Sequence, residues 1–183
     1  DGIGNEYVEN RKNLFIGKTE DGRSIYKTNY AENTPKTEKQ ADVINLVQNV
    51  WSKQPIKLTI KKDGVQKEIT VKFNPELSER SDLSKIAFGN RKGTASEKRM
   101  TMNLAPDFYQ IAEESTYNYS ADEHHEGKEN NPAHDNSKEW HYFVNNLVYQ
   151  EANGEQIDAH MNIDVKETTD GQYFYSFALE KGT

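Results

Sequence analysis

Four of the five histidines in this chain of 183 residues fall within one polar stretch, residues 124–141. They are His124, His125, His134 and His141. Histidine titrates nearest to neutral pH of all side chains, so a cluster of this kind can bind a divalent metal or transfer protons in a reaction. Histidines on a solvated loop that do neither give the same pattern. The sequence therefore poses a choice among three roles for this stretch.

The spacing of these histidines fits no metal-binding signature. Together with Asp135 they offer imidazole and carboxylate ligands of the kind that zinc accepts. A His-Glu-x-x-His helix is absent, however, and the adjacent His124 and His125 cannot easily face one ion from a regular element. We therefore expect His124 and His125 to face solvent, and we predict no metal and no other cofactor.

His141 differs from the other three because it begins a predicted strand. Side chains alternate along a strand, so His141 shares a face with Phe143, and the opposite face carries Trp140 and Tyr142. A histidine held by a rigid strand beside a polar loop is well placed to act as a general acid or base. The alternative is a structural histidine at the edge of a sheet.

Groups that could act with His141 lie on the two strands expected to follow it. Tyr175 and Ser176 point to opposite faces of the last strand, so only one of them can share a site with His141. Lys166 and Glu167 on the middle strand present the same choice. The sequence alone does not pair a nucleophile with a base and an orienting group.

A locally basic segment stands out in the acidic chain. Six basic residues lie between positions 80 and 99, and cations such as Arg91 and Arg99 could hold phosphates. Tyrosines that follow in the sequence, Tyr109 and Tyr117 among them, could stack on bases. The alternative is a solvated basic surface beside core aromatics.

The composition limits the partners and the compartment. A net charge of −7 disfavours general binding to nucleic acid, although it permits local basic patches. The chain has no cysteine, which excludes disulfides and thiolate metal sites. No apolar run reaches about 18 residues, so we expect no membrane partner and a cytoplasmic location. Phosphate-binding glycine loops and the Gly-x-Ser-x-Gly elbow are also absent.

The patterning predicts an α+β fold. Residues 13–30 and 56–73 read as β-hairpins around a helix that begins at Thr34-Pro35 and ends before Pro55. A second helix is expected over residues 105–115, a long loop over 116–138, and a C-terminal three-stranded antiparallel meander over 140–179. We expect an N-terminal unit, residues 1–80, and a C-terminal unit, residues 81–183, that share one core.

Local phrases in the second unit resemble a known class of domains. These phrases are residues 81–90, Ala112-Glu113-Glu114-Ser115, Glu139-Trp140-His141-Tyr142-Phe143 and the segment 170–176. Over residues 81–181 the chain resembles domains of large polyvalent proteins from phages and integrative mobile elements of gut Firmicutes. Some of those domains are similar to the small RNases related to barnase, RelE and EndoU.

The resemblance implies a metal-independent RNase-like domain that acts on RNA. Its active site would place His141 for acid–base work, Ser176 or Tyr175 on the last strand, and a basic partner among Arg91, Arg99 and Lys166. The alternative is a non-catalytic acidic module that binds a protein partner or mimics nucleic acid. The chain begins Asp1-Gly2 without Met, which predicts that it is part of a larger polypeptide.

Overall fold

The protein is α+β and rich in strands. The computed structural model describes residues 15–28, 30–31, 33–51, 53–73, 94–122 and 137–182. The strands are β1 (Phe15–Lys18), β2 (Ser24–Lys27), β3 (Ile56–Lys62), β4 (Val65–Phe73), β5 (Thr116–Ala121), β6 (Ser137–Gln150), β7 (Gln156–Thr168) and β8 (Tyr173–Lys181). The helices are α2 (Lys36–Leu46), which continues as a π-helical segment η1 (Val47–Trp51), α5 (Ala95–Leu104), the 3₁₀ turn η3 (Ala105–Asp107) and α6 (Phe108–Glu113).

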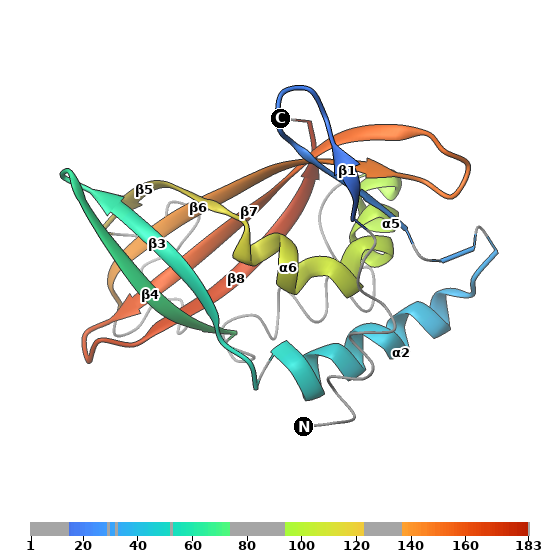
Figure 1. Ribbon diagram of the computed structural model, residues 1–183. Helices are drawn as coiled ribbons and strands as arrows, with labels where there is room; N and C mark the ends of the chain where they lie inside the picture. Colours follow the sequence, from blue (N-terminus) through green and yellow to red (C-terminus); the bar gives the residue numbers. More distant parts are fainter. Residues whose placement is uncertain are drawn as a thin grey trace.

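All eight described strands belong to one sheet in the order β1-β2-β6-β7-β8-β4-β3, with β5 also paired to β6. Strands β6, β7 and β8 form an antiparallel meander, and they are joined to the N-terminal strands by two parallel pairings, β2 with β6 and β4 with β8. β3 is the last strand at one edge of this order, yet it contacts β5, which pairs with β6 toward the other edge. The sheet is therefore curled, with β3 and β4 folding back toward β5 and β6 (Figure 1).

Glycines make the turns that set the register of these strands. Gly154 and Gly171, in the two turns of the meander, have φ angles of 90° and 86°, in the left-handed region that glycine adopts at little cost. Each follows Asn or Asp, as expected for a tight hairpin turn. The register that results pairs His141 with Val165 and Val165 with Tyr175 across the meander.

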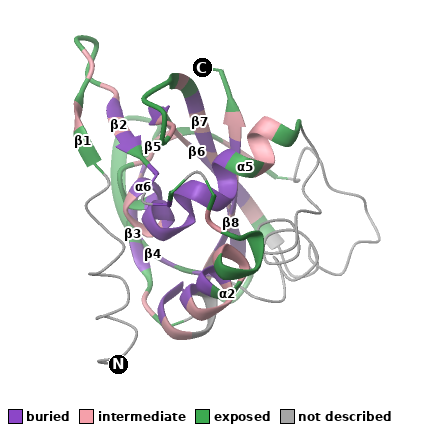
Figure 2. Cartoon of the chain, turned by 90° about the vertical axis from the view of Figure 1, so that its right-hand side faces the viewer, coloured by how far each residue is buried: buried purple, intermediate pink, exposed green. Residues whose placement is uncertain are grey.

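The core lies inside the curl. One cluster of buried apolar residues contains members of both predicted units, from Val43 and Trp51 to Ile163 and Leu179. α6 contacts both β3 and β7, and it crosses in front of β6–β8 in Figure 1. Figure 2 shows buried residues along α6 and the long strands. The residues of β6 and β7 that face this core are the odd-numbered ones, such as Phe143 and Ile163.

Residues 116–138, expected to form a loop, contain strand structure at both ends. β5 occupies Thr116–Ala121 and pairs with the first half of β6, which itself begins at Ser137. The polar composition of Thr116–Ala121 gives no sequence signal for a strand. The strand is stabilised by pairing with β6 and has no apolar pattern of its own. None of the helices in the described residues has the length and apolar character needed to cross a membrane.

Candidate functional site

Two polar side chains of β6 point into the curl of the sheet. Glu139 and His141 are two residues apart, so strand alternation puts them on the face that also carries the core residue Phe143. The side chains of Trp140 and Tyr142 lie on the opposite face, as the sequence predicts. His141 is only 2% exposed, so its ring is desolvated and its polar contacts define its role.

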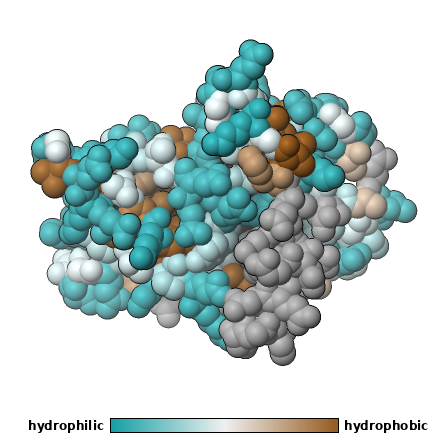
Figure 3. Space-filling model, viewed as in Figure 1, coloured by the Kyte–Doolittle hydropathy of each residue, from teal (hydrophilic) through white to brown (hydrophobic). Residues whose placement is uncertain are grey.

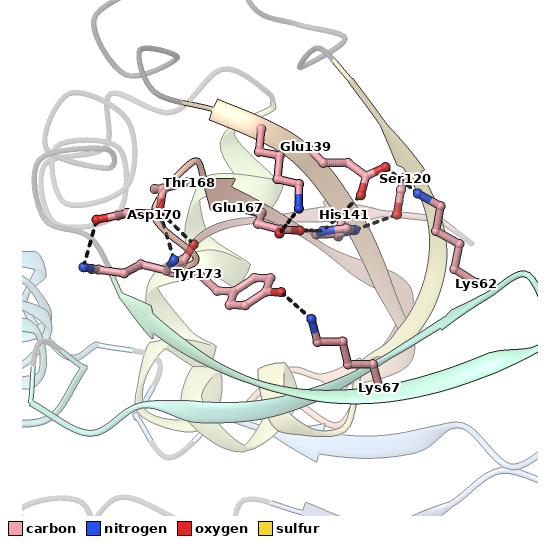
Figure 4. Close-up of polar contacts among 11 residues, drawn as sticks. Lys62, Lys67, Ser120, Glu139, His141, Glu167, Thr168, Asp170 and Tyr173 are labelled. Carbon is pink, nitrogen blue, oxygen red and sulfur yellow. Dashed lines mark hydrogen bonds and ion pairs between the residues drawn. The ribbon is translucent and has the colours of Figure 1, made fainter.

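The neighbouring strands complete the cluster. On β7 the residue opposite Glu139 is Glu167, and on β8 the residue opposite Glu167 is Tyr173. His141 Nε2 lies 2.9 Å from Glu167 Oε1 and 3.7 Å from Glu139 Oε1. The rings of His141 and Tyr173 have centroids 6.2 Å apart. Groups from three strands therefore meet at one end of the meander (Figure 4).

The other nitrogen of His141 is held by β5. His141 Nδ1 lies 2.6 Å from Ser120 Oγ, which in turn lies 2.6 Å from the hydroxyl of Tyr117. An irregularity in β5 between Tyr117 and Tyr119 makes this possible, because Tyr117 pairs with Phe143 and Ser120 pairs with His141. Without that bulge, residues three apart would point to opposite faces of the strand. The bulge thus aligns a hydrogen-bonded chain from Tyr117 to Glu167.

One arrangement of protons satisfies every member of this chain. The Tyr117 hydroxyl donates to Ser120 Oγ, the Ser120 hydroxyl donates to His141 Nδ1, and His141 Nε2–H donates to Glu167. Ser120 does not line the cleft described below, and its hydroxyl is engaged on both sides. We therefore interpret Ser120 as a group that orients His141, rather than as a nucleophile.

Three lysines surround the carboxylates and the tyrosine. Lys62, near the end of β3, forms an ion pair with Glu139. Lys138 Nζ lies 3.4 Å from Glu167 Oε2. Lys67, on β4, donates a hydrogen bond of 3.2 Å to the Tyr173 hydroxyl. Two of these cations come from the β3–β4 hairpin, which faces the meander across the site in Figure 4.

The contacts set the charge states of the cluster. Burial opposes the charge on Glu167, but the hydrogen bond from His141 and the nearby Lys138 ammonium outweigh it and lower the pKa of Glu167 below its usual value. The hydrogen bond to Glu139 raises the pKa of Lys62, and the hydrogen bond to Tyr173 raises the pKa of Lys67. At neutral pH the site therefore holds an ionised Glu167 beside ammonium groups.

These side chains line an open cleft of about 360 Å³. Its polar lining is Lys62, Asp63, Lys67, Lys138, Glu139, His141, Glu167 and Tyr173, and Ile60 and Val65 add apolar surface. The mouth of a curled sheet is a common place for ligand sites. The cleft can offer a carboxylate base, a phenol and several cations to one bound anion.

Of the residues predicted for a site, the cleft contains His141 and Glu167. Tyr175 is on the same face of the sheet as Tyr173, but it lies two residues further from the Asp170-Gly171 turn. It is buried in the core, where the centroid of its ring is 5.5 Å from that of Phe73. Ser176 pairs with Asp164 in register and therefore lies on the opposite face. Lys166 pairs with Trp140 and lies on that face as well.

Arg99 is remote from the cleft. It extends from α5 to form an ion pair of 2.9 Å with Glu151, which follows the end of β6. Glu151 is ten positions beyond His141, a separation of roughly 30 Å along an extended strand. Arg91 lies outside the described residues, as do His124, His125, His134 and Asp135, which the sequence analysis considered as metal ligands.

Several members of the cluster were not singled out from the sequence. Glu139 had a usable signal, since it lies two positions before His141 on one strand. Tyr173 had one too, because counting outward from the Asp170-Gly171 turn pairs it with Glu167. Lys62, Lys67 and Ser120 had none, because their positions depend on how the β3–β4 hairpin and β5 pack against the meander.

Comparisons with protein-family models, with curated proteins and with solved structures found no match to this chain.

Proposed function

We propose that this protein is a metal-independent endoribonuclease, in which the cleft between the β3–β4 hairpin and the meander cleaves RNA by attack of a 2′-hydroxyl on the adjacent phosphate. The observation that carries the proposal is the pair formed by Glu167 and His141 at 2.9 Å, on the wall of a cleft that also presents Lys62, Lys67 and Lys138. A base, a proton donor and cations are the groups that this reaction requires.

Glu167 is the best candidate for the base. It lines the cleft, and its pKa lies below the usual value, so it is ionised at neutral pH. His141 acts through Glu167, because both of its ring nitrogens are already engaged and its ring is nearly buried. We assign His141 the role of positioning Glu167 and stabilising the charge that this carboxylate carries.

Tyr173 is the best candidate for the acid. Its hydroxyl accepts a hydrogen bond from the Lys67 ammonium, which would stabilise a phenolate formed by proton loss. Tyr173 and Glu167 are directly opposite across β7 and β8, so their side chains start from neighbouring backbone positions. Glu167 can therefore accept the proton of the attacking 2′-hydroxyl while the adjacent Tyr173 donates a proton to the leaving 5′-oxygen.

The lysines would bind the phosphate and offset the charge that develops on it. The side chains of Lys62 and Lys138 are 44% and 64% exposed and can turn from their carboxylate partners toward a bound phosphate. The lysine end of each pair reaches solvent, so water can solvate an ammonium group while it moves from the carboxylate to the phosphate.

Glu167 takes the proton of the 2′-hydroxyl while the 2′-oxygen forms a bond to phosphorus. The bond from phosphorus to the 5′-oxygen breaks, and Tyr173 gives its proton to that oxygen. The products are a 2′,3′-cyclic phosphate and a free 5′-hydroxyl. Solvent then returns the proton from Glu167 to the Tyr173 phenolate.

A cleavage assay in excess chelator tests the proposal. The substrate is a labelled single-stranded RNA, and the control substrate is the same sequence with 2′-O-methyl groups, which lack the attacking hydroxyl. We expect cleavage of the first and not of the second. Glu167→Gln should lower the rate by about 10²–10⁴-fold, which is the usual contribution of a general base.

Arg99→Gln is the matched control, because Arg99 is a predicted cation that the fold places away from the cleft. It should cleave at the rate of the unsubstituted protein. Cleavage that persists in Glu167→Gln, or that does not require the 2′-hydroxyl, would contradict the proposal. Tight binding of RNA without any cleavage would favour a non-catalytic binding module instead.

A further inference from the structure

We propose that Glu139, His141 and Glu167 form a binding site for a divalent transition-metal ion such as Zn²⁺, and that the bound ion inhibits the cleft. The inhibitory part rests on the proposed function, whereas the binding part stands without it. Within the described residues, these three side chains form the one group whose ligand atoms converge closely enough to hold an ion.

The geometry needs only small side-chain movements. The three ligand atoms lie within 4.8 Å of one another, with His141 Nε2 2.9 Å from Glu167 and 3.7 Å from Glu139. Zinc bonds of about 2.0–2.2 Å in a tetrahedral arrangement require ligands roughly 3.4 Å apart. Rotation of the two carboxylates achieves this, because both come from strands whose backbones already face one another in register.

The contacts behind His141 suit a metal ligand. An imidazole that binds a metal through Nε2 carries its proton on Nδ1 and usually donates it to an oxygen. Ser120 Oγ lies 2.6 Å from Nδ1 and can accept that proton, with the Ser120 hydroxyl then donating toward Tyr117. The chain from Tyr117 to His141 can thus reverse direction and fix the ring in the orientation that binding requires.

Two lysines already pair with the carboxylates of the proposed metal site. Lys62 is paired with Glu139, and Lys138 is 3.4 Å from Glu167. Both lysine side chains are long and reach water, so an ion with two charges can displace their ammonium groups. A combination of one imidazole and two carboxylates favours a borderline ion such as Zn²⁺ over Ca²⁺ or Mg²⁺, which prefer oxygen ligands throughout.

Binding would remove the proposed base from the reaction. A metal bonded to Glu167 withdraws electron density from the carboxylate and so makes it a weaker base toward the 2′-hydroxyl. The protein would then cleave RNA in chelator and lose that activity when zinc is added. Zinc bound by Glu139, His141 and Glu167 would inhibit RNA cleavage in the cleft.

Binding is tested by calorimetric titration of Zn²⁺ into the chelator-treated protein and by the visible absorption of added Co²⁺, neither of which depends on RNA. We expect saturation at one ion per chain. Glu139→Gln, which retains the size of the side chain, should weaken binding at least tenfold. Glu180→Gln is the matched control, because Glu180 lies 3.8 Å from His160 in a His–Glu pair elsewhere on the sheet.

A variant with His124, His125 and His134 all replaced by Ala separates this site from the histidine-rich stretch. It should bind one ion as the unsubstituted protein does. Absence of saturable binding, or binding that the triple variant abolishes and Glu139→Gln leaves unchanged, would overturn the site. If binding behaves as expected and no RNA is cleaved in chelator, the metal site stands and the ribonuclease proposal fails.

Discussion

Asp107 immediately precedes α6 and Glu114 immediately follows it, and the charge of Glu114 acts on the Asp107 carboxyl group. Asp107 is 1% exposed, and neither of its oxygens has a hydrogen-bond partner among the described residues. Burial, and then the charge of Glu114, raise the pKa of Asp107 to about 7. A buried carboxyl of this kind destabilises the fold once it ionises.

Asp107→Asn should therefore stabilise the protein, and more so at higher pH. In the unfolded chain the carboxyl ionises near its ordinary pKa, so rising pH favours unfolding between roughly pH 4 and pH 7. The full penalty is present above pH 7 and is at most about 4 kcal/mol, from about 3 pKa units. Because the new amide also lacks a partner, we expect a gain of about 1–3 kcal/mol at pH 8.

Urea unfolding at pH 5 and pH 8 measures this effect, with the exposed Asp122→Asn as the control. The difference between Asp107→Asn and the unsubstituted protein should shrink toward low pH. An equal difference at both values of pH would show that ionisation of Asp107 is not its cause.

Ser120→Ala should destabilise the protein by about 1–3 kcal/mol, because it leaves a nearly buried imidazole nitrogen without its partner. Ser176→Ala is the matched control, since Ser176 lies on the opposite face of the same sheet. Its effect should be within about 0.5 kcal/mol. Equal free energies of unfolding for the two variants would argue against the hydrogen-bonded chain that holds His141.

Lys138→Gln should lower the salt dependence of RNA binding. Each phosphate neutralised on a single strand contributes about 0.7 to the slope of log affinity against log salt concentration. Fluorescence anisotropy with 2′-O-methyl RNA measures this slope without cleavage, and Lys138→Gln should reduce it by about that amount. Lys57→Gln, on the exposed side of β3 beside Glu68, should leave the slope unchanged. A lower slope in Lys57→Gln and an unchanged slope in Lys138→Gln would show that RNA binds away from the cleft.

Trp51→Ala should cost about 3–5 kcal/mol of stability, as truncation of a large buried ring usually does. Trp51 is 1% exposed, and its ring centroid lies 5.5–5.9 Å from those of Phe73, Phe108 and Phe177. Trp51→Phe should lose less than half as much, because the indole nitrogen has no hydrogen-bond partner among the described residues. Thermal or urea unfolding compares the two, and similar losses would contradict this reading of the core.

Local sequence patterns were enough to predict the turns and strand faces that depend on residues adjacent in the sequence. Asn153-Gly154 and Asp170-Gly171 indicate the meander turns, and alternation predicts that His141 and Phe143 share a face. The α+β class follows from the same patterns. Each of these features depends on a few consecutive residues, whose turn chemistry and side-chain period are readable without the fold.

The cleft depends on long-range pairings that no local pattern encodes. The parallel pairing of β4 with β8 brings Lys67 to Tyr173, and the bulge in β5 brings Ser120 to His141. Alternation gives the face of Tyr175 but not its depth in the curl, so it does not show that Tyr175 lies in the core and that Tyr173 reaches the cleft. The basic segment that includes Arg99 suggested phosphate binding, but among the described residues the cations that reach the cleft are isolated lysines on three separate strands.

The surface over these elements is largely polar. On the face seen in Figure 3, hydrophilic residues cover most of the described surface, and hydrophobic residues appear in small separate patches. The exposed apolar residues of the described chain are few, Val65 at the rim of the cleft among them. This surface favours a charged ligand over a broad apolar partner.

The position of β8 between β7 and β4 also governs when the cleft can exist during protein synthesis. Among the described strands, β4 pairs with the meander through β8 alone, so the hairpin that carries Lys62 and Lys67 has no strand of the meander to pair with until residues 173–181 have been made. A nascent chain that stops short of them also lacks Tyr173. Chains that end before β8 are therefore without the cleft, and any chemistry that it performs begins only after β8 has been made.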